Sequence, residues 1–317
     1  MKLIVQIPCY NEAETLESVI STIPKRIEGI DKIETLIIDD GSTDGTSELA
    51  KKIGVTHIIR HAKNKGLARS FHRGIDECLK RGADIIVNTD GDNQYDSADI
   101  AKLVAPVVRG EADIVVGDRG GMDNPHFSTF KKRLQVFGSW VIGKMVGYNI
   151  PDAVSGFRAI SRDAAQRLNI VSDFSYTIEM LVIAGARRMA VISVPINTNG
   201  KTRESRLFKS IPYFLKMSVS TLLRMYTMHS PLRVFLVLGG GLFFIGALPI
   251  VRFLFYYFGG DGGGHIQSLI IGGTLCMLGF MTLLAGVLAD LVHFNRRLLE
   301  KALYKIHRLE CELDRTQ

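Results

Sequence analysis

Two carboxylates separated by one glycine, Asp90 and Asp92, belong to the stretch Asn88–Gln94, which directly follows the apolar run Asp84–Val87. The run is typical of a buried strand, and the carboxyl ends of strands are where open α/β sheets hold their ligands. Hard carboxylate oxygens at this place suit Mg²⁺ or Mn²⁺, and a metal there would clamp a diphosphate. The alternative is an ordinary polar turn, because Asp, Asn and Gly are the usual turn residues.

The elements that must position this pair alternate between strand and helix over residues 1–117, which predicts an α/β fold with a mostly parallel, doubly wound sheet. The loops at 8–12, 39–46 and 88–94 should therefore share one rim of that sheet. We predict strands at Leu3–Ile7, Lys32–Ile38, Thr56–Arg60, Asp84–Val87, Ala112–Gly117, Arg158–Ser161 and Met189–Val194, and helices at Leu67–Arg81, Ala98–Val108, Phe127–Tyr148 and Thr177–Ala186.

Composition narrows the class of protein. The chain has 46% hydrophobic residues and a net charge of +7, which favour contact with lipid and with anionic partners. Basic residues interleaved with exposed aromatics, the pattern of nucleic-acid binding, are not evident, so phosphates at a membrane surface fit better. The four cysteines lack metal-site spacing. The first loop has no G-x-G-x-x-G pattern, which argues against a nicotinamide cofactor.

Four motifs follow one another along the chain: Pro8–Glu12, Asp39–Ser42, the Asp90-x-Asp92 pair with Gln94, and Val154–Arg158. Together they resemble family 2 glycosyltransferases of the GT-A fold, over about residues 1–210. Within that family the chain resembles the dolichol-phosphate mannose synthases and polyprenyl-phosphate glucosyltransferases, because the basic stretch at 203–207 and the later apolar segments match their layout.

The resemblance implies roles on the nucleotide side of the site. Pro8, Tyr10 and Glu12 would line the nucleoside. Asp39 and Asp40 would accept hydrogen bonds from its base or ribose, as carboxylates can. The alternative for these two aspartates is capping of the helix that starts near Thr46, although Ser42 and Asp44 are better placed for it.

The resemblance also assigns the Asp-Gly-Asp stretch. Asp90, with Gly91, would contact the sugar or ribose, while Asp92 and Gln94 would hold the metal on the donor diphosphate. The bare chemistry of the pair adds Asp90 to the metal ligands. The Mg²⁺ or Mn²⁺ would act as a Lewis acid that compensates the charge of the departing nucleoside diphosphate.

A polyprenyl phosphate acceptor would be mostly dianionic at pH 7 and would bring its own nucleophile, so no general base is needed. The enzyme then needs cations, and arginine forks match phosphate oxygens in pairs. Arg119 and Arg206 align with family positions and join Asp90 and Asp92 as the proposed catalytic residues; solvated surface charge is the alternative for Lys132 and Arg133. The candidate phosphate ligands are Arg119, Lys132, Arg133, Lys201, Arg203 and Arg206.

The C-terminal third predicts membrane attachment. Residues 207–229 form an amphipathic segment, an interfacial helix or alternatively a core helix of the soluble domain. Val234–Val251 and Ile266–Ala289 lack Asp, Glu, Lys and Arg and are close to the roughly 20 residues that cross a bilayer. We therefore predict four regions: a catalytic domain over 1–206, the interfacial helix over 207–229, two transmembrane helices within 230–292, and a basic helical tail over 293–317.

Arg233 precedes the first span and basic residues follow the second, whereas the connection at 259–265 has no lysine or arginine, so both ends should be cytoplasmic. The early strand after Met1 leaves no room for a signal peptide. We expect a multi-pass inner-membrane protein with a cytoplasmic catalytic domain. Leu299, Ile306 and Leu313 belong to a short heptad-like seam in the tail, which indicates either self-association or packing on the catalytic domain.

The sequence thus predicts an inverting, metal-dependent transferase that moves a sugar from a UDP- or GDP-sugar to a polyprenyl or dolichyl phosphate. One alternative is a polysaccharide- or glycolipid-extending enzyme of the same family. It is disfavoured because processive synthases carry a Gln-x-x-Arg-Trp motif, whereas Trp140, the single tryptophan, follows Gly138-Ser139. Another alternative is an inactive membrane scaffold that keeps the fold.

Overall fold

The computed structural model describes residues 1–120, 138–144, 146–170, 176–199, 220, 223–224, 226–228, 230–260 and 263–316. The chain divides into two compact units, one of Met1–Leu222 with Tyr304–Gln317 and one of Leu223–Leu303. The predicted interfacial helix over 207–229 falls largely outside the described residues. The predicted helix over Phe127–Tyr148 is described only from residue 138, where it is helical through residue 144.

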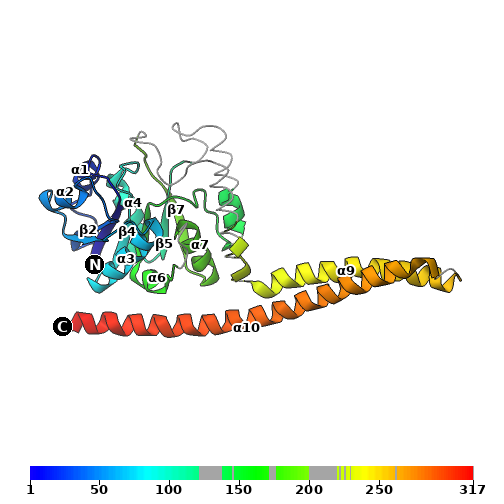
Figure 1. The fold of residues 1–317 in the computed structure, drawn as a ribbon. Coiled ribbons are helices and arrows are strands. Elements are labelled where there is room, and N and C mark those ends of the chain that lie inside the picture. The colour runs from blue at the N-terminus through cyan, green and yellow to red at the C-terminus, as the bar shows by residue number, and fades with distance from the viewer. Residues whose placement is uncertain are drawn as a thin grey trace. The chain divides into compact units, whose positions relative to one another are not determined.

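A seven-stranded sheet forms the centre of the first unit, with strand order β3-β2-β1-β4-β6-β5-β7 (Figure 1). All pairs are parallel except those of β6, which runs antiparallel between β4 and β5. The prediction of a mostly parallel sheet is confirmed, whereas the place of β6 within the sheet was not predicted. The strands are β1 (Lys2–Cys9), β2 (Lys32–Asp39), β3 (His57–Arg60), β4 (Ile85–Asn88), β5 (Ile114–Asp118), β6 (Arg158–Ser161) and β7 (Val191–Pro195).

Helices cover the sheet, so its central strands β1 and β4 are buried along nearly their whole length. Continuous apolar runs are typical of parallel strands that are covered on both faces. Helix α3 approaches β1 closely at Gly74, where an added Cβ would lie 2.4 Å from Gln6 Oε1. The predicted helix at 98–108 begins one residue earlier as a 3-10 turn. The helices are α1 (Leu16–Ser21), α2 (Thr46–Lys52), α3 (Leu67–Lys80), η1 (Ser97–Asp99), α4 (Ile100–Val108), α6 (Arg162–Arg167) and α7 (Tyr176–Ala186).

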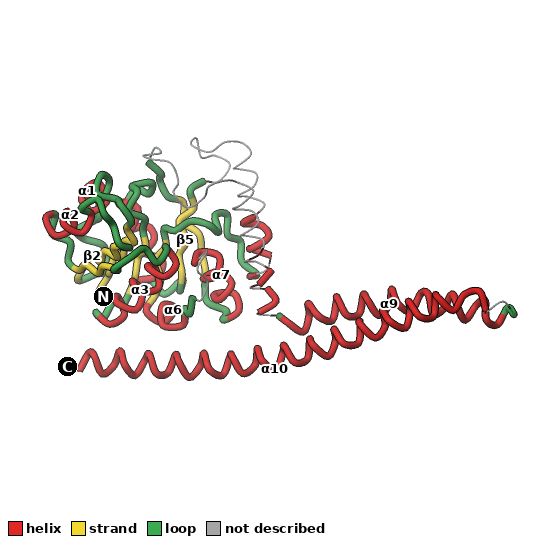
Figure 2. The backbone as a smooth tube through the Cα atoms, in the orientation of Figure 1, coloured by secondary structure: helices red, strands yellow, loops and turns green. Residues whose placement is uncertain are grey.

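The second unit contains the two long apolar helices, α9 (Pro231–Phe258) and α10 (Ile266–Thr316), joined through the turn η3 (Gly263–His265). Their apolar windows have mean hydropathies of 2.4 and 2.2, and 11% of each window is buried. Both helices are long and apolar enough to cross a membrane, which fits the two predicted spans. Figure 2 shows α10 as one unbroken helix, so the predicted boundary at residue 293 is not a helix end.

Glycines seven residues apart allow α9 and α10 to pack with their backbones close together (Figure 1). A Cβ added at Gly246 would lie 2.7 Å from Cys276 N, and one at Gly279 would lie 2.7 Å from Phe243 N. Such close approach is typical of small residues between membrane helices. The sequence analysis did not use this pattern, whose members are Gly239, Gly246, Gly272, Gly279 and Gly286.

Candidate active site

The loops after β1, β2 and β4 meet at one rim of the sheet, as predicted. Asn11 N donates to Ser42 Oγ over 2.9 Å, which joins the first loop to the second. Thr15 Oγ1 donates to the carbonyl oxygen of Gly91 over 2.6 Å, which joins the first loop to the Asp-Gly-Asp stretch. Loops whose contacting residues lie 31 and 76 positions apart in the sequence are therefore held together by direct hydrogen bonds.

The Asp-Gly-Asp loop places its glycine inward and its two aspartates at partial exposure. A Cβ added at Gly91 would lie 3.0 Å from Cys9 Sγ and 3.1 Å from Glu12 Cγ, so the first loop leaves no space for a side chain there. Asp92 Oδ1 accepts a hydrogen bond from Gln94 N over 3.1 Å, which closes a tight turn. The glycine thus lets the loop lie close to the first one while both carboxylates stay near the surface.

The donor set of this loop fits a divalent metal that also binds phosphate. Asp90, Asp92 and the amide of Gln94 supply hard oxygen atoms within five residues. In the part of the chain that the structure describes, no group of three or more His, Cys, Asp or Glu side chains forms a complete cage for a metal. Two carboxylates without a cage suit Mg²⁺, which is usually held by one or two carboxylates together with substrate phosphates.

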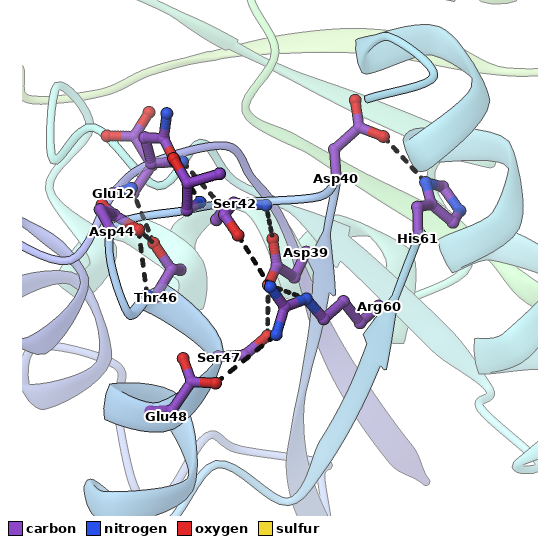
Figure 3. A network of polar contacts seen from close by, with 12 residues as sticks. Glu12, Asp39, Asp40, Ser42, Asp44, Thr46, Ser47, Glu48, Arg60 and His61 are labelled. Atoms are coloured by element: carbon purple, nitrogen blue, oxygen red, sulfur yellow. Dashed lines mark hydrogen bonds and ion pairs between the residues drawn. The ribbon is translucent and has the colours of Figure 1, made fainter. Parts of the chain in front are cut away.

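Asp39 lies beneath the rim and has an exposed fraction of 0%. Its Oδ1 accepts a hydrogen bond from Ser42 N over 2.7 Å, and its Oδ2 accepts one from the Ser47 hydroxyl. Arg60 Nε lies 3.5 Å from the same Oδ2 (Figure 3). These contacts fix the β2 loop, and the nucleoside contact that the resemblance implies for Asp39 stays a prediction.

Asp40 is also buried and points away from Asp39 (Figure 3). Its carboxylate lies 2.8 Å from His61 Nδ1 and accepts 2.8 Å hydrogen bonds from the backbone N–H groups of Lys65 and Gly66. It therefore organises the turn between β3 and α3. The capping alternative fails for both aspartates, since the first N–H of α2, that of Thr46, donates to Asp44 over 3.0 Å.

The first loop provides one exposed aromatic ring. Tyr10 is 39% exposed, whereas Pro8 is buried within β1 and Glu12 is 6% exposed. Glu12 N donates to Thr46 Oγ1 over 3.0 Å, so its backbone also ties the first loop to the second. Of these three predicted nucleoside residues, Tyr10 is the one that presents a large surface at the rim.

The chain after β7 returns to the Asp-Gly-Asp loop. Asn199 N donates to Gln94 O over 2.9 Å, and Asn199 Nδ2 donates to Asn93 O over 3.0 Å. Thr198 bridges Tyr95 in an antiparallel contact. The residues that directly precede the basic segment 201–206 are thus fixed beside the candidate metal loop. The predicted phosphate ligands that lie outside the described residues are Lys132, Arg133, Lys201, Arg203 and Arg206.

Arg119, directly after β5, forms a two-pronged ion pair with Asp152. The Nε–Oδ2 distance is 2.6 Å and the Nη2–Oδ1 distance is 2.9 Å, and the Asp152 side chain is fully buried. Burial by itself lowers the pKa of Arg119, but Tyr95 and Asp152 raise it above its ordinary value. Asp152 fixes the orientation of the guanidinium and neutralises it in place, so the predicted phosphate ligand has a built-in carboxylate partner.

The Val154–Arg158 motif has an internal role at Arg158. This fully buried guanidinium donates 2.8 Å hydrogen bonds to the carbonyl oxygens of Ala153, Ser155 and Thr177. Burial lowers its pKa to about 10. Arg158 therefore shapes the turn that places Gly156 beside Asp90.

The sequence analysis missed Asp152, Tyr95 and Tyr176. Tyr95 directly follows Gln94, so its position in the motif was a usable signal. The pairing of Asp152 with Arg119 and the approach of Tyr176 to the loop depend on tertiary structure, and nothing in the local sequence indicates them.

A mixed sheet with carboxylate loops at its carboxyl rim and an Asp-x-Asp pair after β4 defines a glycosyltransferase of the GT-A fold. The chain belongs to glycosyl transferase family 2, whose profile matches residues 4–168.

Known relatives include two lipid-phosphate glycosyltransferases. The UDP-N-acetylglucosamine–dolichyl-phosphate N-acetylglucosaminyltransferase of Methanococcus voltae is 29% identical over 218 residues, covering 61% of this chain and 83% of the relative. The dolichol-phosphate mannosyltransferase of Pyrococcus furiosus is 30% identical over 218 residues, covering 65% of this chain and 59% of the relative. The present chain therefore spans less than two thirds of the Pyrococcus protein.

A solved structure with the same fold is glucosyl-3-phosphoglycerate synthase from Mycobacterium tuberculosis, in complex with Mn²⁺, UDP-glucose and phosphoglyceric acid. The TM-score is 0.56 at 21% identity, and the match covers 71% of this chain and 79% of that one. At this identity the likeness establishes the fold.

Proposed function

We propose that this protein transfers a sugar from a nucleoside-diphosphate sugar to a polyprenyl phosphate at a membrane. The observation that carries the proposal is the fixing of Thr198 and Asn199 beside the Asp90–Gln94 loop, since a basic segment follows directly at 201–206. The basic segment, which suits a second phosphate, thus begins beside the loop that suits a metal-bound diphosphate. The two relatives named above carry dolichyl phosphate in their names, which supports this acceptor class.

On the donor side, Asp90, Asp92 and Gln94 would hold Mg²⁺ or Mn²⁺ against the diphosphate. The bound metal would supply Lewis-acid stabilisation of the leaving group. Tyr10, the exposed ring of the first loop, would cover the nucleoside, with Pro8, Glu12 and Gly91 shaping the floor beneath it. Asp40 and the buried Asp39 would hold the wall of that pocket through the contacts already described.

On the acceptor side, a phosphate oxygen would attack the anomeric carbon of the sugar. A new carbon–oxygen bond forms, the bond to the diphosphate breaks, and the nucleoside diphosphate leaves with the electron pair. A single displacement of this kind inverts the anomeric configuration. The dianionic phosphate has no proton to lose, so no general base is required.

Cations would hold the acceptor phosphate, as charge-assisted contacts do. Arg119 is already paired with Asp152, which lowers the attraction that it exerts on a phosphate. We therefore assign more of the acceptor binding to the basic residues beyond the described part of the chain, Lys132, Arg133, Lys201, Arg203 and Arg206.

The membrane helices would keep the enzyme at its lipid substrate. Arg233 lies in the first turn of α9, and basic residues follow the apolar part of α10, whereas the connection at 259–265 has no lysine or arginine. Positive residues favour the cytoplasmic side. We propose that the protein lies in the inner membrane. Both ends of the pair α9 and α10, and the catalytic unit, would face the cytoplasm.

The test is to give membranes containing the full chain a panel of radiolabelled UDP- and GDP-sugars together with polyprenyl phosphate, and to extract the lipid product. Matched membranes with Asp92→Asn serve as the control. We expect label in a polyprenyl phosphate sugar with at least one donor, and none in the control.

Polyprenol of the same chain length separates the acceptor classes. The proposal predicts no transfer to it, because the site is assigned no base that deprotonates a hydroxyl. Efficient transfer to polyprenol or to a free saccharide would favour the saccharide-extending alternative. Failure of all donors to react, with no metal-dependent cleavage of any of them, would favour the inactive scaffold.

A further inference from the structure

A buried polar cluster lies directly behind the Asp90 carboxylate. Asn88, the last residue of β4, has an exposed fraction of 0%. Its Nδ2 donates to Gly156 O over 2.8 Å and to the Tyr176 hydroxyl oxygen over 3.1 Å. The end of β4 and the start of α7 are therefore joined through polar contacts immediately before the candidate metal loop.

Packing against Phe71 holds the ring of Tyr176 in place. It stacks on Phe71 of α3, with the ring centroids 4.1 Å apart and an angle of 17° between the planes. Tyr176 is 3% exposed and Phe71 is fully buried. The stacking and the Asn88 contact together leave the hydroxyl oxygen little freedom to move.

Gly156 marks the place where this hydroxyl and the Asp90 carboxylate converge. A Cβ added at Gly156 would lie 2.8 Å from the Tyr176 hydroxyl oxygen, and 3.0 and 3.2 Å from the two carboxylate oxygens of Asp90. Gly156 N donates to the Tyr95 hydroxyl over 3.0 Å, which fixes the backbone there. A residue with a side chain at 156 would collide with both groups.

The Tyr176 hydroxyl can donate a hydrogen bond. Its oxygen accepts from Asn88, so its own hydrogen points elsewhere. A tyrosine phenol has an ordinary pKa of about 10 and is therefore protonated at neutral pH.

We propose that Tyr176 is a positioning residue that donates its hydroxyl hydrogen to the Asp90 carboxylate and so fixes that carboxylate toward the metal. The inference rests on the proposed function of the Asp90–Gln94 loop. Asn88 and Phe71 set the hydroxyl, and Gly156 keeps the space between hydroxyl and carboxylate clear. Groups that orient metal ligands in this way commonly change metal affinity by roughly 10- to 100-fold.

Binding of Mn²⁺ alone to the full chain in detergent tests this role, by titration calorimetry or by the electron paramagnetic resonance signal of free Mn²⁺. Tyr176→Phe keeps the ring and removes only the hydroxyl. Tyr148→Phe is the matched control, because the Tyr148 hydroxyl donates to Met189 O over 2.6 Å and has no part in the Asp90 cluster. Thermal midpoints of both variants are measured in the same detergent.

We expect Tyr176→Phe to weaken Mn²⁺ binding by roughly tenfold, and Tyr148→Phe to leave it unchanged at a comparable thermal midpoint. On an Asp90→Asn background, Tyr176→Phe should have no further effect, since the hydroxyl acts through Asp90. Wild-type affinity in Tyr176→Phe, equal loss in Tyr148→Phe, or full additivity with Asp90→Asn would overturn the inference while leaving the proposed function in place. Absence of Mn²⁺ binding by the wild-type chain would overturn the metal site and this inference with it.

Discussion

The loops after β2 and β4 have similar compositions but different structures. Each has two aspartates close together with glycine next to them. In the β2 loop both carboxylates are buried and accept hydrogen bonds from the surrounding protein (Figure 3). In the β4 loop the glycine is buried and the two aspartates remain partly exposed.

The difference shows that residue type alone does not separate a buried carboxylate from a partly exposed one. Backbone N–H groups saturate Asp40, and the side chains of Ser47 and Arg60 contact Asp39. Buried carboxylates of this kind are stable when their hydrogen bonds are satisfied. In the β4 loop the glycine, and not an aspartate, faces the interior, which supports the proposal that its carboxylates bind a ligand.

The largest expected effect is on catalysis, in the β4 loop. Asp92→Asn keeps the size of the side chain and removes its charge, so stabilisation of the leaving diphosphate should fall. We expect at least about a 100-fold loss of turnover, about 2.7 kcal/mol in activation free energy. The measurement is transfer of labelled sugar to lipid, with the thermal midpoint unchanged. Full activity of this variant, or of wild type in excess EDTA, would refute the metal site.

The next effect is on stability, in the β2 loop. Asp39→Asn keeps an acceptor for Ser42 N, but it removes the buried charge and places an NH₂ group where Oδ2 accepts from the Ser47 hydroxyl and faces Arg60. We expect a loss of about 2–3 kcal/mol in unfolding free energy. Thermal or denaturant unfolding of the full chain measures it. Asp31→Asn, whose carboxylate is 90% exposed, is the control and should change stability by less than about 0.5 kcal/mol. Equal stability of both variants would contradict a scaffold role.

Most of this fold could be predicted from the sequence, for physical reasons. The parallel strands were visible because continuous apolar runs are typical of strands buried on both faces. The shared rim followed from the rule that parallel strands end on the same edge. Strand β6 could not be placed, because it follows β5 by 39 residues and pairs antiparallel with both β4 and β5. Only tertiary contacts decide such an insertion.

The site was less accessible to sequence reasoning. The motif at Asp90–Gln94 located the loop, but burial of Asp39 depends on the fold around it. The same holds for Asp152, which is 33 residues from Arg119 and has no local signature. In the second unit, the charge-free runs located the two long apolar helices α9 and α10. The helices extend beyond these runs, because polar residues such as Arg296 and Glu300 form helical pairs four residues apart.

A smaller effect compares two glycines of the β2 loop. Gly41 and Gly45 have φ angles of +79° and +86°, so alanine is strained at both. A Cβ at Gly41 would also lie 2.8 Å from the backbone carbonyl carbon of Lys63, whereas one at Gly45 would meet no atom within 4 Å. We expect Gly41→Ala to cost about 1–2 kcal/mol more than Gly45→Ala in unfolding experiments. Equal costs would show that the close packing of this loop is not needed.

The smallest effect is a pH dependence at Glu34, a scaffold carboxylate within β2. Burial alone would raise the pKa of Glu34, but contacts with Lys32, Lys2 and His57 outweigh this effect. Together they lower the pKa from an ordinary 4.5 to about 2. Because the folded-state pKa is lowered, the stabilisation is complete above about pH 4.5 and is lost as the pH falls toward 2. Glu34→Gln should cost about 1 kcal/mol at pH 7, since Lys32 is 67% exposed and its charge is screened. Unfolding curves at several pH values should show the two proteins converging in acid; a difference that persists at pH 2 would contradict this.

The central claim is that the β4 loop, and not the β2 loop, holds the divalent metal. Titration of Mn²⁺ into the full chain in detergent tests it directly, with Asp92→Asn and Asp40→Asn compared at matched folded concentration. We predict that Asp92→Asn weakens binding at least about tenfold and that Asp40→Asn binds as the wild type does. Loss of Mn²⁺ binding in Asp40→Asn together with wild-type binding in Asp92→Asn would contradict the claim.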